Sequence, residues 1–242
     1  MIDPVSLTAL SIQNDMQRMS VSANNAANAL TTGFKREYLV ASGQFDASLS
    51  PIASAEGVLT LAPSLRSITD QRAGVARQTS GALDIALLGQ GYFEVRTENG
   101  LAYTRQGNFR LDDVGRLVTQ NGALVNGIGG EIVLTTPTPT IDRSGKIFEN
   151  GKQVAQLKVV AFDSPQELSN IGGGLAIVSS NTIPYQVQQV RVAQGQLESS
   201  NVDSTQEMVH MMETFRHFET SHRVLQAYDE MNDKALRNLG QF

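Results

Sequence analysis

The sequence predicts an α+β protein in which N- and C-terminal helices pair in a coiled-coil-like domain, with a central all-β domain of short antiparallel strands. Three observations predict this class. Apolar residues follow a heptad spacing near the N-terminus, a similar spacing recurs near the C-terminus, and the region between alternates with period two and is broken by Gly-containing turns. We expect an N-terminal helix at residues 1–34, an extended connector at 35–75, a β-rich domain at 76–198 and a C-terminal helix at 199–242.

The N-terminal helix carries signals at both ends. Asp3 is a good N-cap, Pro4 suits the first helical turn, and Gly33 is placed to end the helix in a left-handed conformation. Between them the spacing alternates between four and three residues, at Val5, Ala9, Ile12, Met16, Met19, Ala23, Ala26 and Leu30. This heptad seam predicts a helix that packs on other helices.

The C-terminal segment from about Val202 to Leu239 also predicts a helix, which Asn201 or Asp203 can cap. One stripe with spacings of three and four residues consists of Met208, Met211, Phe215, Phe218, His222 and Leu225. A second stripe further along consists of Val224, Tyr228, Met231 and Ala235. The helix therefore has apolar surface on more than one side, and we expect the two terminal helices to pack on each other or on other chains.

The middle of the chain has strand character. The stretch "GYFEVRTENGLAYTRQGNFRLDDVGRLVTQNGALV" alternates short β-rich runs with turn residues. Further candidate strands are Glu131–Thr135, Val154–Phe162, Ala176–Val178 and Tyr185–Val192. Residues 35–75 are rich in Ser and Ala, are broken by two prolines and show weak periodicity, so they predict a connector.

Composition excludes several classes of function. A net charge of −5 argues against a nucleic-acid partner, which would require a basic face. The absence of cysteine excludes disulfides, thiolate metal sites and cysteine nucleophiles. The opening "MIDPVSLTAL" lacks the pattern of a cleaved signal peptide, and no segment has the roughly 18 consecutive apolar residues of a membrane span. We therefore expect no membrane insertion.

No motif indicates an enzyme. His210, His217 and His222 lie on the C-terminal helix without carboxylates that would complete a metal site, and the Gly-rich runs lack a following Gly–Lys–Ser/Thr. Asp112 and Asp113 resemble an acid pair but lie in a predicted hairpin turn, and no G-x-S-x-G motif occurs. We expect no catalytic residues, no cofactor and no bound metal.

Three blocks of the chain, in order, resemble the signatures of the bacterial flagellar axial proteins, the rod and hook family. "SANNAANALTTGFKRE" is similar to the N-terminal signature, and "LDIALLGQGYFEVRTENGLAYTRQGNFRLDDVGRLVTQNG" to the central block. "LESSNVDSTQEMVHMMETFRHFE" is similar to the C-terminal signature. The chain departs from the family pattern at Ala26, where the family usually has Leu, and at Thr32, where it often has Pro.

The resemblance implies a structural subunit of the flagellar basal-body rod. Such a subunit is exported through the flagellar type III apparatus without a cleaved signal, and joins copies of itself and other axial proteins in a helical tube that carries motor torque across the periplasm. By length the chain resembles the short proximal-rod members, and a distal-rod protein is the alternative. An alternative from a different class is a self-contained β-domain binding module of the adhesin type, whose two terminal helices form a hairpin with each other and with no other chain.

Small side chains on the helices yield little free energy per residue when buried within one chain, but they allow close approach between chains. We therefore predict that the terminal helices order when several subunits supply the missing surface, with asparagines hydrogen-bonding across subunits. The predicted subunit-interface residues are Val5, Ile12, Met16, Met19, Ala23, Asn24, Asn25, Ala26, Asn28, Leu30, Gly33, Phe34, Asn201, Val202, Met208, Met211, Phe215, Phe218 and Leu225.

Overall fold

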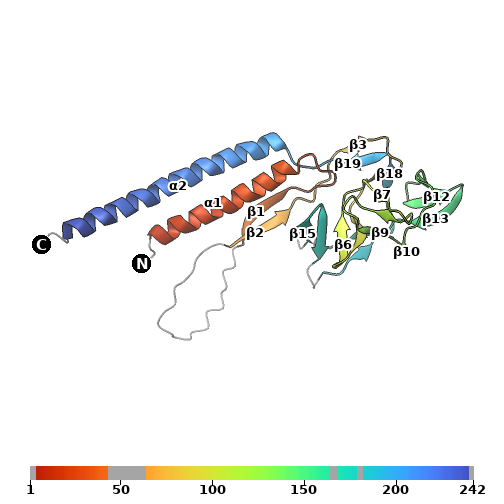
Figure 1. Ribbon diagram of the computed structural model, residues 1–242, viewed down its shortest axis with the longest axis horizontal. Coiled ribbons are helices and arrows are strands. Elements are labelled where there is room, and N and C mark those ends of the chain that lie inside the picture. The colour runs from red at the N-terminus through yellow and green to blue at the C-terminus, as the bar shows by residue number, and fades with distance from the viewer. Residues whose placement is uncertain (1–3, 43–63, 164–167, 179–181, 240–242) are drawn as a thin grey trace, which may run out of the picture. The chain divides into compact units, whose positions relative to one another are not determined.

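The computed structural model describes residues 4–42, 64–163, 168–178 and 182–239 (Figure 1). The chain divides into two compact units. A helical unit is formed from residues 1–26, 37–68 and 204–242, and a β unit from residues 27–36 and 69–203. Each unit therefore combines segments that are far apart in the sequence. The chain is α+β, as the sequence predicts.

The helical unit contains helix α1 (Pro4–Ala27), helix α2 (Ser204–Leu239), and a two-stranded sheet of β1 (Glu37–Ser42) and β2 (Ser64–Thr69). The two helices run antiparallel, side by side (Figure 1). They are in contact where Asp15 Oδ2 lies 2.6 Å from His217 Nδ1. Terminal helices are thus present as predicted.

Two local features differ from the sequence-based expectation. Helix α1 ends at Ala27, six residues before Gly33, although Gly33 does have the left-handed φ of 67° that was expected of it. Strands β1 and β2 form within the predicted connector. The hairpin signal was missing because the two strands lie more than twenty residues apart, with no short turn between them.

The heptad seam of α1 is only half correct. In the structure, one set of residues spaced seven apart is half-buried, namely Val5, Ile12, Met19 and Ala26. The other set, Ala9, Met16 and Ala23, is exposed. Three residues after Val5, Ile12 and Met19, the buried or half-buried residue is polar, namely Thr8, Asp15 and Ser22. We call the set Val5, Thr8, Ile12, Asp15, Met19, Ser22 and Ala26 the inner stripe of α1, and the exposed set Ala9, Met16 and Ala23 its outer stripe.

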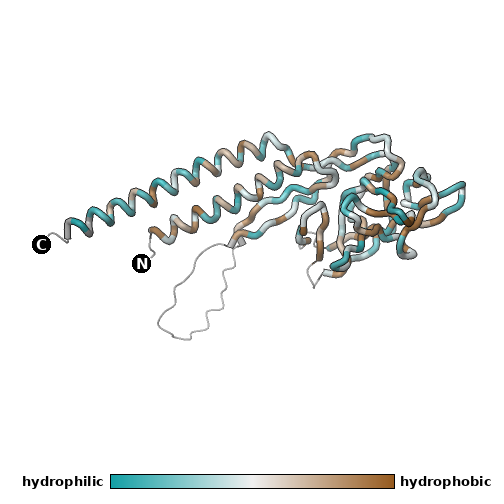
Figure 2. Tube along the Cα trace, viewed as in Figure 1, coloured by the Kyte–Doolittle hydropathy of each residue, from teal (hydrophilic) through white to brown (hydrophobic). Residues whose placement is uncertain are grey.

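Helix α2 follows the same arrangement. Its inner stripe consists of the buried or half-buried Glu207, Met211, Thr214, Phe218, Ser221 and Leu225. Its outer stripe consists of the exposed Met208, Met212 and Phe215. Figure 2 shows apolar and polar residues alternating along both helices. Spacing alone assigned both sets to one seam because the inner and outer stripes lie next to each other on the helix surface.

The β unit is built on one large antiparallel sheet with the strand order β15-β16-β6-β5-β9-β8-β7. Strand β14 pairs with β5 and β17, and β10 pairs with β9. The bounds are β5 Tyr92–Thr97, β6 Gly100–Thr104, β7 Arg110–Leu111, β8 Leu117–Val118, β9 Leu124–Gly127, β10 Gly130–Glu131, β14 Val159–Ala161, β15 Leu168–Gly172, β16 Leu175–Val178 and β17 Tyr185–Gln186. The short strands and antiparallel pairing match the predicted all-β domain.

Smaller sheets complete the β unit. Three strands pair in the order β11 (Thr140–Ile141), β12 (Lys146–Glu149) and β13 (Lys152–Gln156). Strand β18 (Val192–Gln194) pairs with β4 (Ile85–Leu87), and β19 (Gln196–Glu198) pairs with β3 (Ala76–Gln78). The segment by which the chain enters the β unit and the segment by which it leaves are therefore paired with each other through β3 and β19.

The core of the β unit is apolar on both faces of the large sheet. The main cluster includes Ile85, Phe93, Val95, Leu117, Val125, Ile132, Ile147, Leu157 and Val159, all below 2% exposed. A second cluster contains Tyr92, Tyr103, Val160, Phe162 and Leu168, in which the ring of Phe162 contacts both tyrosines. Two clusters of this kind explain how the unit orders many short strands without a disulfide.

Two turns of the β unit repeat one motif. In "DDVGR" Asp112 Oδ1 accepts hydrogen bonds from the amides of Val114 and Arg116, at 3.0 and 2.7 Å. In "DRSGK" Asp142 Oδ1 accepts from the amides two and four residues later, both at 2.9 Å. A Gly with positive φ follows at the same place in both turns. Asp112 is thus a turn-capping residue rather than a catalytic acid.

Glu149 gives the β unit an acid-sensitive contact. Its carboxylate accepts hydrogen bonds from the amides of Thr135 and Thr136, each at 2.8 Å, and from both hydroxyls, each at 2.9 Å. These bonds, that from the Thr136 amide foremost, lower the pKa of Glu149. Because the pKa is lower in the folded chain, the stabilisation is complete above the ordinary carboxyl pKa of about 4 and is lost as the pH falls through the folded value.

We therefore expect Glu149→Gln to weaken the folded β unit at pH 7 and to flatten its loss of stability between about pH 5 and pH 2. The measurement is urea unfolding, followed by circular dichroism, at a series of pH values. Glu98→Gln, at an exposed position in the turn between β5 and β6, is the matched control. An acid profile of Glu149→Gln parallel to that of the unmodified chain would contradict this role for the Glu149 carboxylate.

Candidate functional site

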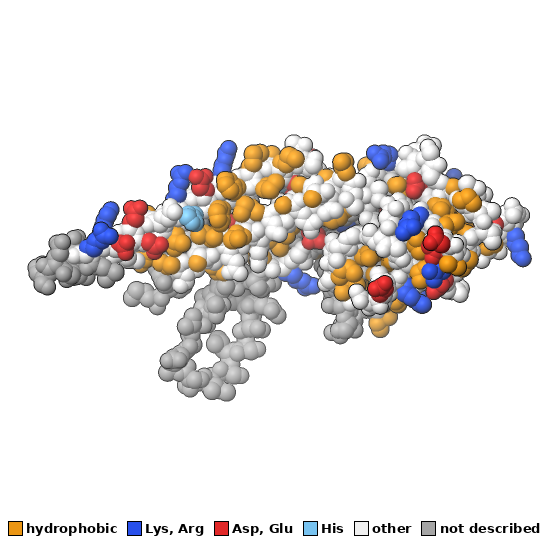
Figure 3. All heavy atoms as spheres, in the orientation of Figure 1, with side chains coloured by type: hydrophobic (Ala, Val, Ile, Leu, Met, Phe, Trp, Pro, Cys, Tyr) orange, Lys and Arg blue, Asp and Glu red, His pale blue; other side chains and the backbone are white. Residues whose placement is uncertain are grey.

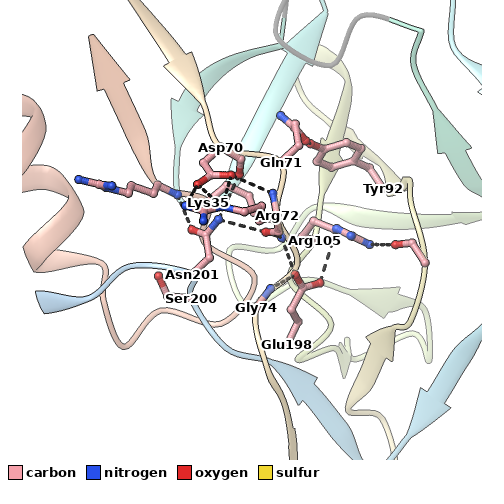
Figure 4. Close-up of polar contacts among 12 residues, drawn as sticks. Lys35, Asp70, Gln71, Arg72, Gly74, Tyr92, Arg105, Glu198, Ser200 and Asn201 are labelled. Atoms are coloured by element: carbon pink, nitrogen blue, oxygen red, sulfur yellow. Dashed lines mark hydrogen bonds and ion pairs between the residues drawn. The ribbon is translucent and has the colours of Figure 1, made fainter.

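A buried ionic cluster lies where several segments of the β unit meet (Figure 4). The Lys35 ammonium is 2.5 Å from Glu198 Oε1, and the two side chains are only 6% and 3% exposed. Lys35 Nζ also donates a hydrogen bond to the carbonyl of Arg72 at 2.8 Å. Burial lowers the pKa of Lys35, and the hydrogen bond and charge of Glu198 act in the opposite direction.

Glu198 is the centre of this cluster. Its Oε1 also accepts a hydrogen bond from the amide of Gly74 at 2.9 Å, and Arg105 Nε lies 3.5 Å from its Oε2. Arg105 Nη1 donates to the carbonyl of Gly89 at 2.7 Å, and its guanidinium carbon lies 5.8 Å from the centre of the Tyr92 ring. One carboxylate therefore faces two cations, and all three side chains are at most 6% exposed.

Asn201 extends the cluster towards the start of α2. Its Oδ1 accepts a hydrogen bond from the amide of Arg36 at 2.7 Å. Its Nδ2 donates to the carbonyls of Asp70 and Arg72 at 3.1 and 3.0 Å. The sequence offered Asn201 as a helix cap, but its side chain instead joins three segments of the β unit. Asp203 directly precedes Ser204, the first residue of α2.

Gly33 and Phe34 also belong to the interior of the β unit. The Gly33 amide donates to the carbonyl of Glu198 at 2.7 Å, and a Cβ at Gly33 would lie 2.5 Å from the carbonyl carbon of Arg105. Phe34 is 5% exposed. These two predicted interface residues are therefore held within the subunit.

We name Lys35, Gly74, Arg105, Glu198 and Asn201 the junction. The chain passes between the two units after residues 26, 36, 68 and 203. All of the junction residues except Arg105 come from segments close to three of these points, at 33–36, 69–74 and 198–203, and Arg105 directly follows β6. Within the β unit, the junction thus fixes the ends of the segments that continue into the helical unit.

In the helical unit, Asn25 ties the end of α1 to the start of β1. It is 1% exposed. Its Nδ2 donates to the Glu37 carbonyl at 2.7 Å, and its Oδ1 accepts from the Glu37 amide at 2.9 Å. Asn25 is one of the asparagines predicted to bond across subunits, but its amide and its carbonyl group both form hydrogen bonds within its own chain. Asn24 is exposed and Asn28 is half-buried.

Asn25→Ala is expected to lower the free energy of unfolding of the helical unit by about 1–3 kcal/mol, because the half-buried amide and carbonyl of Glu37 lose their partners. Thermal unfolding followed by the helix signal in circular dichroism measures this change. Gln17→Ala, at an exposed position of the same helix, serves as the control and should change stability little. Equal melting curves for the two variants would exclude the structural role of Asn25.

The remaining predicted interface residues fall into two groups. One group is half-buried and comprises Val5, Ile12, Met19, Ala26, Val202, Met211, Phe218 and Leu225. The other is exposed and comprises Met16, Ala23, Leu30, Met208 and Phe215, with Met16, Met208 and Phe215 each more than half exposed and Leu30 98% exposed. Figure 3 shows hydrophobic side chains on the surface along the helices. Their role in contacts between chains stays a prediction.

Sequence reasoning did not single out Lys35, Arg105 or Glu198. All three lie inside the quoted blocks, at "GFKRE", "YTRQG" and "LESSN". The signal that could have pointed to them was the presence of a charged residue in each block. Nothing in one sequence says that these three charges meet, because they are separated by up to 163 residues. Among the residues that the structure describes, no group of three or more His, Cys, Asp or Glu side chains could hold a metal ion. In the same part of the chain, neither helix meets the length and hydropathy needed to cross a bilayer.

Comparison with known proteins places the chain in a family. Residues 86–197 match the flagellar hook protein FlgE/F/G D1 domain, and residues 193–238 match the flagellar basal body rod FlgEFG protein C-terminal domain. The flagellar basal-body rod protein FlgF of Caulobacter vibrioides is 30% identical over 99% of both chains. FlgG of Bacillus subtilis is 29% identical over 91% of this chain and 92% of its own. FlgG of Buchnera aphidicola subsp. Baizongia pistaciae is 30% identical over 89% and 92%. The chain therefore belongs to the flagellar basal-body rod protein family.

Proposed function

We propose that this chain is a structural subunit of the proximal rod, FlgF-like, which joins copies of itself and other axial proteins through its terminal helices. In this proposal the assembled helical tube spans the periplasm and transmits motor torque. The subunit reaches the rod through the flagellar type III export apparatus. It has no catalytic function, in keeping with a family of structural proteins.

The outer stripes are the observation that carries this proposal. Each terminal helix uses its inner stripe within the chain and leaves a second apolar stripe exposed. Met16 on α1 and Met208 and Phe215 on α2 are large apolar side chains that remain more than half in solvent. Contiguous exposed apolar surface of this kind is typical of a protein–protein contact. Methionine adapts to slightly different neighbours, which suits the non-identical contacts of a rod.

The composition of the outer stripes also fits contacts with several chains. Ala9 and Ala23 allow another helix to approach the backbone of α1 closely, but each contributes little free energy at about 25 cal/mol per Å² of apolar surface. One neighbour would therefore stabilise the helix only slightly, and several neighbours are needed. Head-to-tail contacts between two different surfaces of the same kind of subunit generate a helical assembly when they do not close into a ring.

The length of the match favours the proximal rod. The FlgF relative from Caulobacter vibrioides aligns over 99% of both chains, whereas the FlgG relatives align over 88–91% of this chain. A distal-rod, FlgG-like position is the alternative, and it is supported by FlgG relatives of equal identity.

Counting this chain in purified basal bodies by quantitative mass spectrometry tests the proposal. We expect a small copy number, as for one short layer of the rod, relative to the other rod components. A copy number several times larger would assign the chain to the distal rod. Absence of the chain from intact basal bodies would overturn the rod function and return attention to a self-contained binding module.

A further inference from the structure

The inner stripes of α1 and α2 repeat every seven residues, and their apolar members are poorly suited to define one axial position. On α1 these members are Val5, Ile12, Met19 and Ala26, and on α2 they are Met211, Phe218 and Leu225. Each set consists of apolar side chains at heptad spacing. Sliding one helix past the other by seven residues would again bring apolar side chains opposite apolar side chains. The bonds of Asn25 to Glu37 and of Asn201 to Arg36 hold the chain near the ends of the two helices, and a polar contact within the helix pair would act with them in selecting one register.

Asp15 supplies the contact that breaks the repeat. It is the charged residue of the inner stripe of α1 and is 4% exposed. Among the residues that the structure describes, His217 is the hydrogen-bond partner of its carboxylate, at 2.6 Å. His217 itself is 63% exposed and reaches Asp15 from the flank of α2. A buried carboxylate that loses its partner is strongly destabilising, so Asp15 requires this partner.

Shifted registers would either remove this partnership or change its surroundings. A slide of seven residues in one direction places Asp15 opposite Val224, which offers no polar group. A slide in the other direction places it opposite His210, whose ring lies 3.7 Å from the carboxylate of Glu213. There the Asp15 carboxylate would approach a second carboxylate. At His217 the equivalent neighbour is Thr220, which is uncharged.

We propose that the Asp15–His217 pair, together with the bonds near the helix ends, sets the register of α1 against α2. A single buried polar contact in an apolar helix pair is a known means of fixing register at some cost in stability. The pair also determines how the two outer stripes are aligned, because Met16 directly follows Asp15 and Phe215 lies two residues before His217. This last consequence rests on the proposed function, since it concerns the surface offered to neighbouring chains.

Cysteine cross-linking in the purified full-length chain tests the register directly, because the sequence contains no cysteine. Ser11 and Ser221 lie one turn from the Asp15–His217 pair in opposite chain directions, so they are level with each other in antiparallel helices. Ser11→Cys/Ser221→Cys reports the native register. Ser11→Cys/Thr214→Cys and Ser11→Cys/Tyr228→Cys report registers shifted by seven residues either way. We expect the native pair to form its disulfide at least about tenfold faster than either shifted pair, a preference of about 1.4 kcal/mol.

In the background Asp15→Leu/His217→Leu, we expect the advantage of the native pair over the shifted pairs to fall by at least about threefold, with helix content retained. The exchanged background Asp15→His/His217→Asp should restore the preference for Ser11→Cys/Ser221→Cys. If circular dichroism shows that the leucine background has lost its helices, Asp15→Ala/His217→Ala takes its place with the same expectation. An unchanged advantage of the native cross-linking pair in the absence of Asp15 and His217 would overturn the proposal. The result does not depend on rods, so absence of the chain from basal bodies would leave it unchanged.

Discussion

Replacing Glu198 by alanine is expected to lower the free energy of unfolding by about 3–5 kcal/mol, which is the usual cost of removing one partner from a buried ion pair. The change would leave the Lys35 ammonium and the Arg105 guanidinium without their shared carboxylate, in surroundings where both side chains are at most 6% exposed. It would also take the acceptor from the amide of Gly74. Urea unfolding followed by circular dichroism measures the loss.

Two comparison variants separate the charge from the shape of Glu198. Glu198→Gln keeps an acceptor oxygen for Gly74 but removes the charge. We therefore expect it to lower the free energy of unfolding by less than Glu198→Ala does. Lys35→Met/Glu198→Leu removes one cation together with the carboxylate, and we expect it to lose less than Glu198→Ala because fewer charges are left unpaired. A loss below about 1 kcal/mol in Glu198→Ala, the size typical of an exposed pair, would contradict a buried junction.

Phe215→Asp is expected to abolish incorporation into basal bodies while leaving the fold of the β unit intact. The side chain is 55% exposed on the outer stripe of α2, so a carboxylate there costs little in the free chain. Between chains it would be buried among apolar side chains without a partner, at a cost of several kcal/mol. Leu30→Asp, at a residue that is 98% exposed, should have the same effect. The measurements are swimming motility and mass spectrometry of purified basal bodies.

Ala227→Asp is the matched control for this experiment. It adds the same charge to an exposed position of the same helix, outside the outer stripe. We expect normal basal bodies from this variant, and unchanged β-sheet signals in circular dichroism from all three. Normal motility and normal basal bodies in either Phe215→Asp or Leu30→Asp would contradict the assignment of the exposed apolar residues to subunit contacts.

Sequence periodicity predicted the existence of both terminal helices and their heptad repeat, but not which residues face inward. The polar members of the inner stripe, such as Asp15 and Ser22, look like surface residues when only hydropathy is considered. Met16 and Phe215 look like core residues for the same reason. Which stripe faces inward depends on contacts between the helices, such as that of Asp15 with His217, and periodicity does not contain them.

The β domain was predictable in type because Asn–Gly and Asp-containing turns act locally, through the conformations those residues favour. The pairing of β1 with β2 and the meeting of Lys35 with Glu198 were not predictable, because both depend on contacts between distant segments. The hydrogen bonds of Asn25 and Asn201 to backbone groups belong to the same class. For the asparagines, side-chain chemistry indicated a hydrogen-bonding role but could not say whether the partner lies in the same chain.

The junction also constrains the order in which this protein can fold. Lys35 and Glu198 are separated by 163 residues, so their contact closes a long loop and forms only when nearly all of the chain is present. During any process that delivers the chain from its N-terminus, Lys35 has no carboxylate of Glu198 to pair with until residue 198 has emerged. The same ion pair that stabilises the β unit therefore forms late in folding, and the N-terminal segment that contains Lys35 lacks this contact until then.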